Sequence, residues 1–217
     1  MRSSLSLLGW GPRDGQEMGT LESFAEQFDL THIAHSPAIF DKEKLNWLNS
    51  HYIRQMALPD FQKAVEPYLE GCDLAKYSQD KLDLIWTSVR EPMVLLSDIT
   101  AAVSYFFQEP SSLETDAHEA LFASPEDTQL ILTTFLTEVL PSMDFSSPET
   151  IGASVKPFTK RFEQFKVKTI MWTLRAALTG RVHGADLSNT LYILGPETIQ
   201  SRIESILTNV AKKVAVS

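Results

Sequence analysis

The amino-acid sequence predicts an all-α protein, and three observations support this fold class. Apolar residues recur at intervals of three and four along most long segments, as they do on the buried side of an amphipathic helix. The tripeptide Ser-Pro-Glu, a typical helix start, occurs at 124–126 and again at 147–149. The β-like runs VLL and LYIL are short and lie inside helical windows, so no strand is expected.

The first long helix is expected over 42–55, with Asp41 as its N-cap. Within it, Leu45, Leu48 and Tyr52 have helical spacing and are expected to face the core. The later helices follow from the same signals, and residues 93–107 are apolar enough to be buried on more than one side. The other helices are expected at 79–90, from 125, from 148, and at 169–178, 186–194 and 197–213.

Glycine and proline mark the expected breaks between helices. Gly195 is placed to end one helix and Pro196 to begin the next. Linkers are expected near Leu58-Pro59, at 108–114 and at 141–147.

The charge of the chain is unevenly distributed. The 217 residues carry a net charge of −9, but residues 160–217 contain nine basic and four acidic side chains, a local charge of +5. The remaining residues sum to −14. A basic C-terminal third can bind a polyanion even in an acidic protein, and it can equally be a solvated helix surface.

Several classes of protein are not expected. No apolar run approaches the roughly 20 residues of a membrane span. The single cysteine excludes an internal disulfide framework and fits a reducing, cytoplasm-like compartment. Phosphate-loop, dinucleotide-binding, zinc-protease and nucleophile-elbow motifs are absent. The five histidines are scattered, and His32 and His35 lack a third metal ligand nearby, so neither catalysis nor a metal site is expected.

The run from 174 to 195, LRAALTGRVHGADLSNTLYILG, contains a basic turn between two helix patterns. Glycines at 180 and 184 permit the torsions that a tight turn requires, and we call residues 179–184 the 179–184 turn. Arg175, Arg181 and His183 crowd around it, so it could grip an anion such as RNA. The alternative is an ordinary joint between helices with solvated arginines.

A second basic surface is expected on the helix over 42–55. Lys44, Trp47, His51 and Arg54 fall within roughly an 80° arc, away from the core side chains. Tryptophan stacks on bases and Lys or Arg pairs with phosphates, which suits RNA. The alternative is that Trp47 packs against a neighbouring element while the cations are solvated.

Two segments resemble bacterial-type glutamate–tRNA ligase, the class I glutamyl-tRNA synthetase. SPAIFDKEKLNWLNSHYIRQM at 36–56 is similar to the end of its stem-contact region, and the run from 174 to 195 is similar to its anticodon-binding part. The opening LSLLGWGP precedes them in the same order. The resemblance implies helical bundles in three parts, with the stem-contact end at 1–57 and anticodon-binding subdomains at 58–112 and 113–217.

The resemblance also implies tRNA(Glu) as the ligand. Lys44 and Trp47, with His51 and Arg54 on the same face, would touch the tRNA backbone near the D-stem. The anticodon bases would be surrounded by residues of the second segment, namely Arg175, Arg181, Val182, His183, Gly184, Ala185 and Leu187. Arg175 and Arg181 suit polar contacts, whereas Val182 and Leu187 suit packing against bases.

Two departures qualify this resemblance. The H-x-G-H and K-M-S-K-S-like motifs of the catalytic half have no counterpart, so the chain is not expected to activate glutamate. ATP and Mg²⁺ would belong to that half, and no cofactor, DNA or membrane partner is expected here. The chain would be a tRNA-binding fragment or free-standing remnant, cytoplasmic or organellar. The rival is a helical protein-interaction module that has lost RNA binding.

The second departure concerns the last anticodon letter. Family members that accept only their own tRNA use an arginine in a helix turn that aligns with Pro92, and the nearest arginine is Arg90. The resemblance therefore implies a relaxed parent enzyme that also charges tRNA(Gln).

Overall fold

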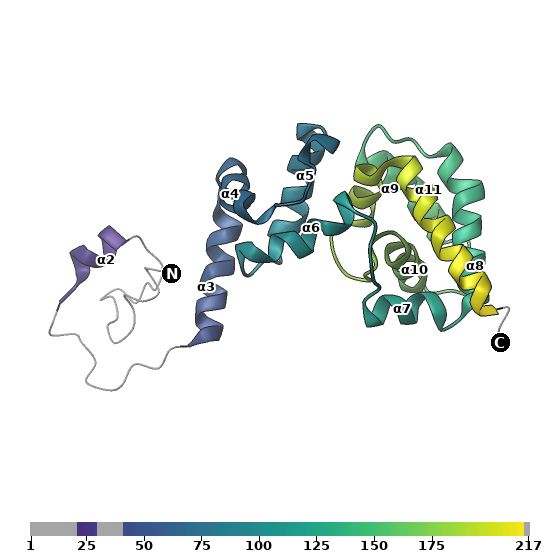
Figure 1. Ribbon diagram of the computed structural model, residues 1–217, viewed down its shortest axis with the longest axis horizontal. Coiled ribbons are helices and arrows are strands. Elements are labelled where there is room, and N and C mark those ends of the chain that lie inside the picture. The colour runs from purple at the N-terminus through teal and green to yellow at the C-terminus, as the bar shows by residue number, and fades with distance from the viewer. Residues whose placement is uncertain (1–20, 30–40, 215–217) are drawn as a thin grey trace. The chain divides into compact units, whose positions relative to one another are not determined.

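The computed structural model describes residues 21–29 and 41–214. Every regular element in these ranges is helical, which confirms the all-α prediction (Figure 1). The pair His32 and His35 lies outside the described residues, as does the opening LSLLGWGP.

The chain divides into two compact units. Unit 1 comprises Met1–Tyr68 with Arg90–Ile99, and unit 2 comprises Leu69–Val89 with Thr100–Ser217. The three domains implied by the resemblance stay a prediction.

Unit 1 contains α2 (Leu21–Gln27), α3 (Lys42–Gln55), α4 (Leu58–Val65) and the 3₁₀ turns η2 (Glu66–Tyr68) and η4 (Leu96–Asp98). The carboxylate of Asp41 accepts a hydrogen bond from the Lys44 N–H at 3.0 Å, which confirms the expected N-cap of α3. The linker expected near Leu58-Pro59 is a short break at 56–57. Leu58 and Pro59 themselves lie in the first turn of α4, where proline is well tolerated.

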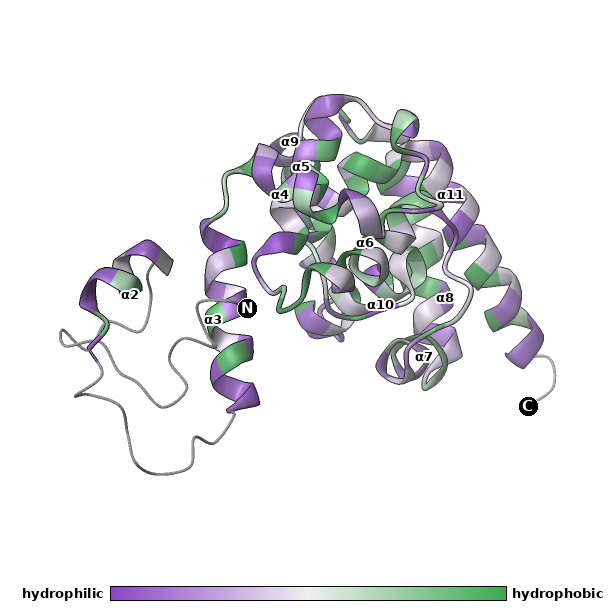
Figure 2. Cartoon of the chain, turned by 60° about the vertical axis from the view of Figure 1, so that its left-hand side comes forward, coloured by the Kyte–Doolittle hydropathy of each residue, from purple (hydrophilic) through white to green (hydrophobic). Residues whose placement is uncertain are grey.

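The buried side of α3 differs from the expected one. Leu48 is buried and Leu45 is half-buried, but Tyr52 is 36% exposed and its ring meets His51 edge-on. Ile53 is buried in its place. An aliphatic side chain needs no hydrogen-bonding partner in the core, whereas a buried tyrosine hydroxyl does. Figure 2 shows the resulting mixture of polar and apolar residues along α3.

Unit 2 is built around α10 (Val167–Thr179), which packs against four other helices (Figure 1). These are α7 (Thr115–Phe122), α8 (Pro125–Thr134), α9 (Pro148–Thr159) and α11 (Leu187–Val214). The other elements are η3 (Leu74–Lys76), α5 (Gln79–Arg90, its last residue in unit 1), α6 (Ile99–Phe107, its first residue in unit 1), the π-helical η5 (Phe135–Val139) and η6 (Leu140–Ser142). Ile170 and Leu174 of α10 are fully buried, so this helix forms the middle of the core.

Local signals set most helix ends in unit 2. Ser147 and Thr150 form a reciprocal capping box at the start of α9. Ser124 precedes α8 as expected, but its side chain makes no capping hydrogen bond, so the proline and the acidic residues of the first turn mark that start. Gly195 has φ 76° and ψ 165°, which interrupts α11 where the sequence predicts one helix to end and another to begin.

The carboxyl ends of α6 and α10 are held together by a buried arginine. Arg202 of α11 is 4% exposed, and its guanidinium donates to the Leu178 carbonyl at 2.5 Å and to the Gln108 carbonyl at 2.9 Å. Lys76 and Tyr77 both donate to the Phe106 carbonyl in the last turn of α6. The last carbonyls of a helix lack partners within it, so these side chains satisfy groups that burial would otherwise penalise. Burial raises the pKa of Tyr77 to about 12.

Gly180 ends α10 in a left-handed conformation against the segment that follows α6. Its φ is 73°, and its carbonyl accepts a hydrogen bond from the Glu114 N–H at 2.9 Å. A Cβ atom at Gly180 would lie 2.8 Å from the Ser112 carbonyl oxygen. Glycine is therefore required here both by backbone torsion and by the close approach of the 108–114 loop.

Replacing Arg202 by methionine should lower the free energy of unfolding by about 3 kcal/mol, because two buried carbonyls lose a charged donor. Urea denaturation followed by circular dichroism measures this loss. Arg161→Met is the matched control, since the Arg161 guanidinium pairs with Glu138 at the surface and should contribute less than about 1 kcal/mol. Equal losses in the two variants would contradict the role given to Arg202.

Gly180→Ala and Gly71→Ala separate steric clash from backbone strain. Both glycines have positive φ, 73° and 86°, but a Cβ at Gly71 would meet no atom within 4 Å. Gly71→Ala should therefore cost about 1 kcal/mol of strain, and Gly180→Ala at least twice that. Thermal unfolding of both variants tests this, and similar melting temperatures would show that the loop yields to the added methyl group.

Candidate nucleic-acid interface

Hydrogen bonds fix both ends of the 179–184 turn. The Thr179 hydroxyl accepts from the Arg181 N–H at 3.3 Å and donates to the Arg175 carbonyl at 2.8 Å. Beyond the turn, the Asp186 carboxylate accepts from the N–H groups of Ser188 and Asn189, at 2.8 and 3.2 Å, and so caps α11. The turn is therefore a defined connection between two capped helices.

Apolar side chains anchor the turn in the core. Val182, Ala185 and Leu187 are at most 5% exposed, whereas His183 and Gly184 are exposed at the tip. The expected packing of Val182 and Leu187 against bases is therefore wrong for their side chains in this structure, since the protein itself covers them. A short turn bearing arginines needs apolar anchors to be held in one conformation.

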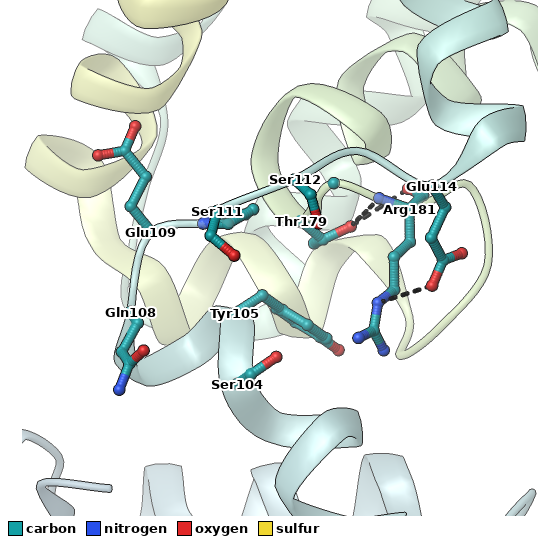
Figure 3. A pocket seen from close by; sticks show the side chains of 11 residues that line it. Ser104, Tyr105, Gln108, Glu109, Ser111, Ser112, Glu114, Thr179 and Arg181 are labelled. Carbon is teal, nitrogen blue, oxygen red and sulfur yellow. Dashed lines mark hydrogen bonds and ion pairs between the residues drawn. The ribbon is translucent and has the colours of Figure 1, made fainter. Parts of the chain in front are cut away.

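Arg181 is held in place on the side of unit 2 where the 108–114 loop passes (Figure 3). Its Nε lies 3.1 Å from a carboxylate oxygen of Glu114, and its Nη2 donates to the Ala101 carbonyl at 2.9 Å. The guanidinium carbon lies 5.8 Å from the centre of the Tyr105 ring. These contacts exclude the alternative of a freely solvated arginine and direct the side chain along one wall of a small cavity.

That cavity is polar and has a volume of about 210 Å³. The hydroxyls of Ser104, Ser111, Ser112 and Thr179 line it together with Arg181, Glu109 and Glu114 (Figure 3). It offers both hydrogen-bond donors and acceptors beside the turn, as the edge of a nucleobase requires.

Arg175 is more buried than the sequence suggested. Its guanidinium donates to the Ala185 carbonyl and thereby ties α10 to the far side of the turn. Desolvation lowers the pKa of Arg175, an effect partly offset by Tyr105 and Asp186. The spacing in the sequence correctly placed Arg175 beside the turn, but it could not show that the side chain folds back onto the backbone.

The structure adds an aromatic group that the sequence reading missed. The Lys168 ammonium lies 4.0 Å from the centre of the Trp172 ring, and His183 meets the same indole edge-on at 5.7 Å. We call these three residues the Trp172 cluster. An exposed cation–π contact contributes about 0.5–1 kcal/mol. The spacing Lys168, Trp172, Arg175 on one helix face was the available signal.

On α3, three of the four residues of the expected basic face are exposed, and the fourth, His51, is half-buried. Trp47 is 51% exposed and stacks on His51, with ring centres 5.7 Å apart. Lys44 and Arg54 are exposed, and Arg54 donates to the hydroxyl of Ser50 at 3.2 Å. Half of the Trp47 side chain is therefore accessible on this face, and its role stays a prediction.

Arg90 and Pro92 are the two residues that the sequence analysis connects with the last anticodon letter. The Arg90 guanidinium donates to the Met56 carbonyl at 2.7 Å and so caps the carboxyl end of α3 within unit 1. Pro92 is exposed. Arg90, the arginine nearest to position 92, therefore already has a structural partner.

Two further properties bear on what the site can bind. Among the described residues, no group of three or more His, Cys, Asp or Glu side chains is arranged to hold a metal ion. In the same part of the chain, no helix has the length and apolar character needed to cross a membrane.

Comparisons with known proteins identify the family of this chain. Residues 60–207 match the family model of the anticodon binding domain. The chain is 31% identical over 208 residues to the glutamate–tRNA ligase of Desulforamulus reducens, a match that covers 94% of this chain and 42% of that protein. The corresponding ligase of Carboxydothermus hydrogenoformans is 33% identical over 207 residues, with coverages of 93% and 42%.

A solved structure has a similar helical fold. It is the crystal structure of a glutamate tRNA ligase from Elizabethkingia meningosepticum in complex with its amino acid, with a TM-score of 0.81 and 26% identity. The match covers 96% of this chain and 40% of that one. The chain thus spans about two fifths of the length of its curated relatives. It belongs to the anticodon-binding domain family and resembles the C-terminal part of glutamate–tRNA ligases.

Proposed function

We propose that this chain binds tRNA(Glu) and serves as the anticodon-recognising part of a glutamate–tRNA ligase. The observation that carries the proposal is the 179–184 turn, which presents the held guanidinium of Arg181 and the exposed His183 beside a polar cavity. Unpaired bases in an RNA loop can be read by such donors and acceptors. The role of the chain is recognition, and cytoplasm is the compartment in which it would act.

The exposed face of α3 would contact the tRNA backbone near the D-stem. Lys44 and Arg54 supply charge for phosphates, and the stacked rings of Trp47 and His51 supply an aromatic surface. Backbone contacts position an RNA without reading its sequence. Two separate surfaces would then divide the work between positioning and recognition.

Glutamate activation would fall to a catalytic half with the motifs that this sequence lacks. ATP and Mg²⁺ are assigned to that half. With a net charge of −9, this chain would bind tRNA through its local basic surfaces. Each phosphate contact releases a counterion, so binding should weaken as salt rises.

Arg181→Ala should weaken binding of tRNA(Glu) and reduce the salt slope by about one, because one released counterion is lost. Gel-shift titrations over a salt series measure both quantities. Arg175→Ala should also weaken binding, but with a loss of stability, since it ties α10 to the Ala185 carbonyl. Arg161→Ala removes the same charge outside the turn and is the control.

The same assay distinguishes the rival functions. A tRNA with a changed anticodon should bind less tightly than tRNA(Glu). Equal binding of the two would indicate a nonspecific basic surface. If no tRNA binds at low salt, the protein-interaction module is favoured instead.

We also infer a relaxed response to the last anticodon letter. Position 92 carries an exposed proline, and Arg90 is engaged with the Met56 carbonyl. The chain should therefore bind tRNA(Glu) and a version carrying the last anticodon letter of tRNA(Gln) with comparable affinity. Pro92→Arg should create a preference of roughly tenfold for unaltered tRNA(Glu), the effect of one good base contact. Strong rejection of the altered tRNA by the unmodified chain would refute the inference.

A further inference from the structure

Two members of the Trp172 cluster, Lys168 and Trp172, lie next to His183 of the turn but have no role in the proposed function. Lys168 is exposed, Trp172 is half-buried and His183 is exposed. Within the described part of the chain, three other aromatic rings are paired with a lysine ammonium, those of Tyr77, Tyr192 and Phe122. Among these four lysine–aromatic pairs, only the pair of Lys168 and Trp172 also contacts a residue of the 179–184 turn, namely His183.

The register of α10 directs the cluster towards the turn. Lys168, Trp172 and Arg175 fall within roughly a 60° arc of the helix. Arg175 reaches the Ala185 carbonyl on one side of the turn, and Trp172 meets His183 at its tip. A ligand held at the turn would therefore find the indole next to it.

A nucleobase could take the place of the Lys168 ammonium on the face of Trp172. The ammonium is exposed and bound to the indole face at 4.0 Å, a weak interaction in water. Stacking of a nucleobase on an aromatic side chain is the stronger interaction. When a base takes the indole face, the displaced ammonium is still close enough to pair with the phosphate of that nucleotide.

We propose that the Trp172 cluster is a stacking platform for one unpaired nucleotide of the anticodon loop, next to the bases that the turn contacts. The base stacks on Trp172, Lys168 pairs with its phosphate, and His183 holds the indole at its edge. Every base has a π-face, so the platform raises affinity without selecting sequence. The inference rests on the proposed function, since it requires the turn to hold RNA.

The test uses the 217-residue chain and an anticodon stem-loop of tRNA(Glu) with a fluorescent label. Trp172→Ala should weaken binding about tenfold with an unchanged salt slope, and Trp172→Phe should retain most of the affinity. Lys168→Ala should instead lower the salt slope by about one. Lys168 is exposed, so this variant is expected to fold, and circular dichroism verifies the fold of the Trp172 variants.

Intrinsic fluorescence provides an independent readout. RNA binding should quench tryptophan emission in the Trp47→Phe control, and Trp172→Phe should remove most of that quenching. Abasic substitution along the loop should identify one position whose loss weakens binding to the unmodified chain but not to Trp172→Ala. Replacing the base at that position by another base should change the binding affinity little.

The possible failures are distinguishable. If the unmodified chain binds the stem-loop and Arg181→Ala weakens binding, but both Trp172 variants bind like the unmodified chain, the platform is refuted and the proposed function stands. If no abasic position depends on Trp172, the platform is refuted as well. Absence of any binding at low salt overturns the proposed function and the platform together.

Discussion

The buried guanidinium of Arg202 is the interaction on which the arrangement of unit 2 depends. It satisfies carbonyls at the carboxyl ends of two helices that are far apart in the sequence, α6 and α10. Because those ends are held together, the 108–114 loop reaches Gly180 closely enough for the hydrogen bond between the Glu114 N–H and the Gly180 carbonyl. The same loop brings Glu114 to Arg181. One buried cation thus places the basic turn and its polar cavity.

The two arginines near the turn perform different tasks. The Arg175 guanidinium donates to the Ala185 carbonyl and so ties α10 to the backbone beyond the turn. Arg181, by contrast, is partly exposed along the cavity wall. Contacts of this kind fix side chains when the protein folds, so the conformational entropy is not lost again when a ligand binds. A prearranged turn compensates for a chain whose overall charge repels RNA.

Signals within a few residues of one another predicted the fold well, and long-range contacts account for what they missed. The bounds of α3, the capping box at Ser147 and the break at Gly195 all follow from local sequence. The burial of Val182 and the partner of Arg90 depend on segments distant in the sequence. Local spacing likewise brought Arg175 and Arg181 to the site, but it could not reveal which guanidinium would face inward.

The break at Gly195 separates the rotational phases of the two halves of α11. In a continuous helix, each residue added or removed turns everything beyond it by about 100°. Here the first half is attached to the basic turn and the second half carries Arg202, with a non-helical residue between them. The orientation of Arg202 in the core and that of the turn at the surface are therefore set independently. A residue inserted into or deleted from one half therefore need not rotate the other half.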